Sequence, residues 1–193
     1  MPRLFATAAL CSTLVLLPAC NSTGENHSDA HMQGEMQQTT HAICVLSSTA
    51  NNTVSGWVKF EQTVGGVRVT AEVAGLTPGK HGFHVHHLGD ISAADGTATA
   101  GHFNPGGHDH GLPSGHGAHS HVGGHAGDLG NLDANADGVA TYDVTFEGLH
   151  LNGPASIIGR SIIVHRDEDD GGQPTGNAGP RIAQGVIGID AAE

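Results

Sequence analysis

Apolar and polar side chains alternate along most of the chain after residue 40. From Val67 to Val73 an apolar residue stands at every second position, which is typical of a half-buried antiparallel strand. From the fourth predicted strand to the end, no stretch shows a convincing helical period. We predict eight strands, over residues 42–46, 54–61, 67–73, 80–88, 128–133, 139–146, 161–165 and 185–189. Eight short strands joined by two long loops predict an all-β fold, an eight-stranded Greek-key β-barrel or an immunoglobulin-like sandwich.

The two long loops are expected to carry the function. The first, over residues 89–127, is longer than a compact domain usually tolerates without secondary structure of its own. Bound metal could supply the order that packing does not. The second loop, over residues 166–181, is charged and rich in glycine.

The N-terminal region predicts export. The apolar run from Leu4 to Ala19 is too short for a membrane span and indicates a signal peptide over residues 1–19. Leu16-Leu-Pro-Ala-Cys20 resembles a bacterial lipoprotein cleavage box, with Cys20 as the lipidated first residue. This predicts a cell-envelope lipoprotein, periplasmic or anchored in the outer membrane. The alternative is ordinary cleavage that gives a soluble secreted protein.

Residues 20–40 are predicted to be the lipidated cysteine and a flexible tether, followed by one domain over residues 41–193. The tether holds His27, His31, Met32 and Met36, which are either solvated linker residues or soft ligands for Cu(I). Beyond Cys11 and Cys20 the chain has only Cys44, so no disulfide between unmodified cysteines is expected within the domain.

The net charge of −12, with 7 Lys and Arg against 19 Asp and Glu, argues against nucleic acid and anionic membrane surfaces as partners. The only membrane attachment that we expect is the lipid at Cys20.

Histidine is the unusual component, with 16 in the chain and most of them between His81 and His125. Because successive side chains of a strand point to opposite faces, His84 and His86 lie on the same face. His102 to Asp128 adds further imidazoles and a carboxylate. These ligand types suit copper and zinc, so the sequence predicts a metal centre.

At this point the chain resembles the copper/zinc superoxide dismutase family, and its eukaryotic branch in particular, over about residues 41–190. The matching phrases occur in the family's order: Gly82-Phe-His-Val-His86, Gly101-His-Phe-Asn-Pro105, Gly127-Asp-Leu-Gly-Asn131, Ile157-Ile-Gly-Arg160, Val164-His165, Gly176-Asn-Ala-Gly179 and Gly185-Val-Ile-Gly-Ile189. The family's fold is a flattened eight-stranded Greek-key barrel, in agreement with the predicted strands.

The resemblance implies one copper and one zinc per subunit. The implied copper ligands are His84, His86, His102 and His165. The implied zinc ligands are His102, which bridges both ions, together with His110, His125 and Asp128. Because the loop before His125 is longer than usual, His116, His119 and His121 compete for that zinc position, and the fixed spacing to Asp128 favours His125.

Two further residues take roles from the resemblance. Arg181 corresponds to the arginine that guides superoxide, and with His102 it is a candidate catalytic residue. Asp169 is expected to link histidines of the copper and zinc sides, although the register of the acidic run 167–170 leaves a plain acidic loop as the alternative.

The remaining histidines are expected to play other parts. We expect His81 to be structural and His87 to face away from the metal. His108, His116, His119 and His121 are either solvated or a secondary metal-capture site.

The chain departs from the family in two ways. The family's disulfide is missing, with Gly96 and Gln184 at its positions, and Pro174 stands where a steering lysine is common. Apolar residues at the family's dimer positions, around Leu88, Ile158 and Ile189, predict a homodimer, with a monomer as the alternative.

The predicted function is superoxide dismutation, in which Cu(II)/Cu(I) cycling and a zinc-supported bridging histidine convert superoxide to O₂ and H₂O₂. The main alternative is a non-catalytic protein on the same barrel that buffers or delivers copper. A purely structural adhesion domain ranks third, because it leaves the seven metal ligands unexplained.

Overall fold

The computed structural model describes residues 38–114, 119–120 and 124–191. The predicted signal peptide, the cysteine predicted to be lipidated and almost all of the predicted tether lie outside the described residues, as do His116 and His121.

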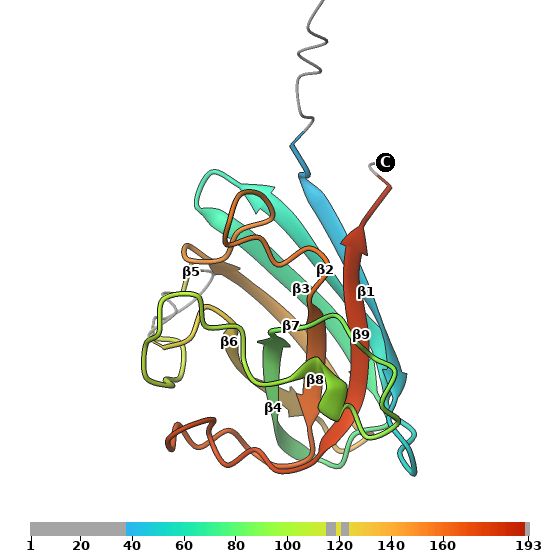
Figure 1. Cartoon of the computed structure of the whole chain (residues 1–193). Helices are drawn as coiled ribbons and strands as arrows, with labels where there is room; N and C mark the ends of the chain where they lie inside the picture. The colour runs from blue at the N-terminus through green and yellow to red at the C-terminus, as the bar shows by residue number, and fades with distance from the viewer. Residues whose placement is uncertain (1–37, 115–118, 121–123, 192–193) are drawn as a thin grey trace, which may run out of the picture. The chain divides into compact units, whose positions relative to one another are not determined.

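The described residues form a β-barrel whose strands surround one hydrophobic core (Figure 1). Along the sheet the strands run in the order β5-β7-β3-β2-β1-β9-β8-β4-β6. All neighbours are antiparallel except the two-residue β5, which pairs in parallel with β7. The strand bounds are β1 His41–Ser48, β2 Ser55–Thr63, β3 Gly66–Ala74, β4 Gly79–His86, β5 His119–Ser120, β6 Asp128–Ala134, β7 Val139–Phe146, β8 Ser161–His165 and β9 Arg181–Ile189.

A tight turn brings the two ends of the sheet together. The backbone N–H of Asn135 donates to Val139 O, so β6 and β7 follow each other directly in a hairpin. Gly138 lies in this turn with φ 73°, a conformation that favours glycine. Eight antiparallel strands therefore form a nearly closed barrel, which confirms the predicted fold.

The burial pattern explains where the metal centre can form. In β3 the apolar positions Val67, Val69 and Val73 are buried while Arg68 and Glu72 are exposed, as the alternation predicts. In β8 every residue is buried, and in β4 the last six are. The outer face of these two strands is therefore covered, and Figure 1 shows the green loop that follows β4 crossing in front of β8 and β9.

Two local features differ from the predictions. The last strand begins at Arg181 and not at Gly185. Residues 182–185 are all buried, and Ala183 and Gln184 pair with both β8 and β1. The loop after β4 contains one 3-10 turn, η1 (Thr97–Thr99), which the sequence pattern did not predict. Within the described residues no helix is long and apolar enough to cross a membrane.

Candidate metal centre

Histidine side chains from β4, β8 and the loop between β4 and β6 converge beneath the two long loops. His84 and His86 project from the same face of β4, and His165 ends β8. The β4–β6 register shifts between Gly82 and His84, and the β8–β9 register shifts between Val164 and His165. Such irregularities re-aim side chains, and here each lies next to a histidine of the cluster.

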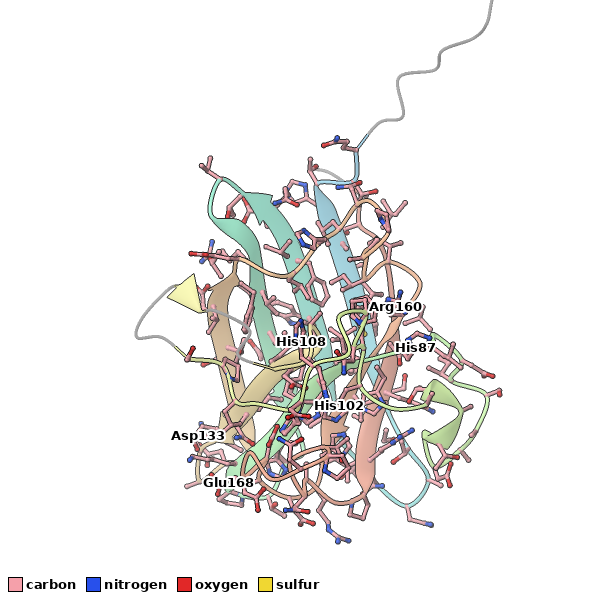
Figure 2. All side chains as sticks on the ribbon, turned by 60° about the vertical axis from the view of Figure 1, so that its left-hand side comes forward. His87, His102, His108, Asp133, Arg160 and Glu168 are labelled. Carbon is pink, nitrogen blue, oxygen red and sulfur yellow. The ribbon has the colours of Figure 1, made fainter. Side chains whose placement is uncertain are left out.

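The structure brings together both ligand sets that the resemblance implied. The potential ligand atoms within each set lie within 4.8 Å of one another, and all of the residues are buried. The first set is His84, His86, His102 and His165, and the second is His102, His110, His125 and Asp128. His102, labelled in Figure 2, belongs to both sets and therefore stands between them.

On the copper side, hydrogen bonds to the backbone orient two imidazoles. His86 Nδ1 donates to Ala100 O at 2.8 Å, and His165 Nδ1 donates to Gly179 O at 2.9 Å. Their Nε2 atoms are left facing each other at 3.4 Å. His84 has the opposite orientation, because its Nε2 donates to Asp169 Oδ2 at 2.7 Å while its buried Nδ1 has no hydrogen-bond partner.

On the zinc side, Asp128 is the centre of the arrangement. His102 Nδ1 lies 2.8 Å from its Oδ1, and His110 Nδ1 lies 2.9 Å from its Oδ2. His125 Nδ1 is 3.2 Å from Oδ1. His110 Nδ1 nevertheless makes no hydrogen bond, so its lone pair and the carboxylate approach each other as two ligands of one ion would.

Asp169 joins the two sides. Its carboxylate accepts hydrogen bonds from His84 Nε2 at 2.7 Å and from His110 Nε2 at 2.9 Å. Burial alone would raise the pKa of Asp169, but these hydrogen bonds and the one from the Gly171 N–H outweigh it and hold the pKa well below its usual range. Gly176 allows the close approach, since a Cβ there would lie 1.9 Å from Asp169 Oδ1 and the backbone has φ 76°. Asp169 is thus the member of the acidic run that faces the histidines.

Three imidazoles of the copper side, those of His84, His86 and His165, are neutral at pH 7. Burial lowers the pKa of His84 to about 4, although the hydrogen bond to Asp169 opposes this shift. Burial, with the neighbouring His84, lowers the pKa of His165 to about 3, and burial holds that of His86 well below its usual range. Neutral imidazole is the form that binds metal ions.

These residues fit a copper ion and a zinc ion. The buried, unpartnered Nδ1 atoms of His84 and His110 belong to different sets, so each set contains a nitrogen whose burial a metal ion would compensate. Four nitrogens suit copper, and three nitrogens with one carboxylate suit zinc. The partners of the other ring nitrogens fix ring orientation, as expected for metal-binding histidines.

Arg181 is held beside the copper side by the loop after β4. Its guanidinium donates to Ala100 O at 2.6 Å, to Thr99 Oγ1 at 3.0 Å, and to Gly96 O. Ala100 O therefore accepts from both Arg181 and His86. Ala100 has a positive φ of 62°, which is uncommon for a residue with a side chain and is typical of sites where function fixes the backbone.

Sequence reasoning missed the groups that hold these side chains in place. Asn131 Nδ2 donates to Asp169 O and the Asp169 N–H donates to Asn131 Oδ1, which fixes the backbone of Asp169. The carbonyls of Ala100 and Gly179 have no residue-type signal, because any residue could supply them. Asn131 lay within a matching phrase, and that phrase was the only signal that could have identified it.

The remaining histidines differ in their surroundings. His81 is buried and donates from Nδ1 to His165 O at 2.9 Å, so it has the structural contact that we expected. His87 and His108 are exposed and belong to neither ligand set. Figure 2 shows His87 near Arg160, which donates to His87 O at 2.7 Å. The side chain of His119 is not among the described ones.

Comparisons with known proteins agree with this geometry. The family model of copper/zinc superoxide dismutase (SODC) matches residues 54–187. A superoxide dismutase [Cu-Zn] of Onchocerca volvulus is 45% identical, over 79% of this chain and 98% of the relative. An extracellular superoxide dismutase [Cu-Zn] of Brugia pahangi is 41% identical, over 86% of this chain and 84% of the relative. The crystal structure of the clock protein EA4 superposes with a TM-score of 0.70 at 39% identity, covering 79% of this chain and 96% of that one. The family match, the relatives and the two ligand sets agree, and the chain belongs to the copper/zinc superoxide dismutase family.

Proposed function

We propose that the chain is an exported superoxide dismutase that uses one copper and one zinc ion. The observation that carries this proposal is the acceptor that Arg181 shares with the copper-side set, since Ala100 O accepts hydrogen bonds from both Arg181 and His86. A copper buffer needs ligands, but it has no need of an arginine positioned beside them for an anion. The overall reaction takes two superoxide anions and two protons to one O₂ and one H₂O₂.

The ions supply chemistry that the side chains lack, because bound copper exchanges single electrons with superoxide while bound zinc fixes and polarises the shared histidine. His84, His86, His102 and His165 would hold copper, and His102, His110, His125 and Asp128 would hold zinc.

His102 is the residue placed to carry a proton. Its Nδ1 faces Asp128 on the zinc side, which leaves Nε2 for the copper side. At that atom it would hold a proton and give it to the departing peroxide. The carbonyls that accept from His86 and His165 fix the surrounding rings during the exchange.

Arg181 supplies the attraction for the anion. Among the other described cations, Arg68, Lys80 and Arg166 each pair with a carboxylate, while Lys59 and Arg160 lie over the rings of Trp57 and Phe103. In a chain with a net charge of −12, the attraction must therefore be local, from the guanidinium of Arg181.

The test is superoxide dismutation measured by pulse radiolysis on copper- and zinc-loaded protein. We expect His84→Ala to abolish turnover, and Arg181→Ala to lower kcat/KM by about tenfold through the loss of local attraction. Arg166→Ala is the matched control, because Arg166 is exposed and paired with Asp167 at 3.3 Å. Stoichiometric copper binding with turnover no faster than that of free copper would refute the proposal and favour copper buffering.

We also propose the finer location that the sequence predicted, a lipoprotein cleaved before Cys20 and tethered by residues 20–40. The apolar run 4–19 and the cysteine after Ala19 support it, and the relative from Brugia pahangi is named as extracellular. Mass spectrometry of the mature N-terminus, with Cys20→Ser as the control, distinguishes a lipidated cysteine from a soluble secreted form.

We further propose that the subunit forms a homodimer through an apolar patch around Leu88, Ile158 and Ile189. Leu88 and Ile189 are 46% and 69% exposed, and Val186 and Val45 are exposed nearby on β9 and β1. Ile189→Asp should convert the dimer to a monomer in analytical ultracentrifugation. A wild-type protein that sediments as a monomer would contradict this proposal without affecting the metal centre.

A further inference from the structure

The loop that carries the acceptors of Arg181 is fastened to β9 by one amide side chain. Gln184 is 7% exposed and lies in the middle of the sheet, paired with Ser47 of β1 and Ile163 of β8. Its Nε2 donates to Ile91 O at 3.3 Å and to Ala93 O at 3.2 Å. A rigid strand thereby holds two successive points of a loop that is otherwise largely exposed.

From Ala93 the hydrogen bonds continue directly to the arginine. Ala93 O also accepts from the Gly96 N–H at 3.0 Å. Gly96 O in turn accepts from Thr99 Oγ1 at 2.9 Å and from the Arg181 guanidinium. The position of the guanidinium therefore depends on a segment that Gln184 anchors.

Gly96 has no side chain with which to anchor the loop, and one placed there would be strained. A Cβ there would lie 3.2 Å from Arg181 Cδ, and the backbone has φ 78°. The nearest groups that such a Cβ would meet belong to Arg181 and Gln184. The loop is instead held from the β9 side, where Gln184 donates to its carbonyls.

We propose that Gln184 is a positioning residue for Arg181, and that its amide is a tether that does not depend on thiol redox state. Cys44 is the only cysteine within the described residues, and it is buried and free, so no disulfide links the loop to β9. Amide-to-carbonyl hydrogen bonds are indifferent to thiol reductants. This inference rests on the proposed function only in that Arg181 is taken to attract the anion.

The variant that tests it is Gln184→Met, which keeps the length of the side chain and removes both donors. Gln62→Met is the matched control, because Gln62 is exposed and its Nε2 donates only within its own hairpin, to Thr63 O and Gly66 O. Gln184→Glu is the second variant, since a carboxylate cannot donate to either carbonyl. Copper and zinc contents measured first establish that each variant is folded and loaded.

Two readouts besides turnover report on the tether. Hydrogen exchange followed by mass spectrometry measures the order of the loop, and azide binding to the copper-loaded protein measures capture of an anion beside Arg181. We expect Gln184→Met to speed exchange in peptides spanning residues 91–99, and to weaken azide binding, each by about fivefold, the scale of a lost buried hydrogen bond. Gln62→Met should leave both unchanged, and a thiol reductant should leave loop exchange in the metal-free wild type unchanged.

Three results would overturn the inference. Unchanged exchange in both Gln184 variants would show that the loop is held elsewhere. Faster exchange with unchanged azide affinity would show a tether that does not position Arg181. Faster loop exchange in the metal-free wild type after reductant would show that a thiol-dependent link holds the loop. None of these readouts requires turnover. A protein without dismutase activity could therefore still confirm or refute the role of Gln184.

Discussion

Replacing Asp169 by asparagine tests how the two metal sites are joined. The carboxylate accepts from the imidazoles of His84 and His110, one on each oxygen. An asparagine has a single acceptor oxygen, so its NH₂ group must face one of the two ring N–H groups. Asn131 fixes the main chain of Asp169 through both its N–H and its carbonyl, so the effect should be confined to the side chain.

The magnitude follows from that count. One charge-assisted hydrogen bond is lost and the other becomes an ordinary one. Together these changes should weaken the free energy of metal binding by about 2 kcal/mol. The affinity of the loosened site should therefore fall by about 30-fold, within the range usual for partners of metal-binding histidines. The site that loses affinity identifies the histidine that the NH₂ group displaces, His84 for copper or His110 for zinc.

The assay is competition with a chelator of known affinity, carried out separately for copper and zinc. Asp170→Asn is the control, because it makes the same chemical change at the next, exposed residue, whose carboxylate accepts hydrogen bonds from Gly172 and Asn177 and from no described histidine. If Asp169→Asn binds both ions as tightly as Asp170→Asn does, the carboxylate does not orient the ligands and the reasoning fails.

Three further outcomes are expected. In the metal-free protein the pKa values of His84 and His165 lie at about 4 and about 3, below the ordinary 6.5. The unfolded chain therefore binds these protons at higher pH than the folded chain does. The free energy of unfolding should be greatest above about pH 6.5, and it should fall by about 3 kcal/mol, from His84 alone, as the pH approaches 4. Urea titrations that give the same free energy of unfolding across this range would contradict the prediction. Burial raises the pKa of the Cys44 thiol to about 12, so iodoacetamide should alkylate it only in denaturant, and rapid labelling of the native protein would be the opposing result. Gly82→Ala should lower the free energy of unfolding by about 1–3 kcal/mol, because the new Cβ would meet Ala178 Cβ at 2.6 Å. Thermal unfolding measures this loss against Gly153→Ala, whose Cβ would meet nothing within 4 Å, after allowance for the strained φ of 80° at Gly153.

Most of the barrel could be predicted because alternation is a local signal. The run from Val67 to Val73 shows its buried face in the sequence itself, and the strand at residues 161–165 has the bounds that the pattern gave. The start of β9 could not be found this way. Residues 182–185 are all buried, with Ile182 and Ala183 in the core and Gln184 against the loop after β4, and alternation disappears where both faces are covered.

The candidate site also has parts that the sequence predicts and parts that it does not. The ligand sets followed from motif phrases, and the fixed spacing between His125 and Asp128 selected the histidine that the structure places in the second set. The supports of Arg181 could not be predicted, because backbone carbonyls leave no trace in residue type. The contacts of Gln184 could not be predicted either, because they join segments about 90 residues apart.

The spread of the site along the chain has a consequence for folding kinetics. Asp169 meets His84 across 85 residues, and His165 meets His86 across 79. Closing such long loops costs conformational entropy before the contacts can form. The ligands therefore come together only when β4 and β8 are already paired. Ions that bind a late-forming site stabilise the native state and leave the transition state unchanged. Copper and zinc should accordingly slow unfolding while the rate of refolding stays that of the metal-free chain.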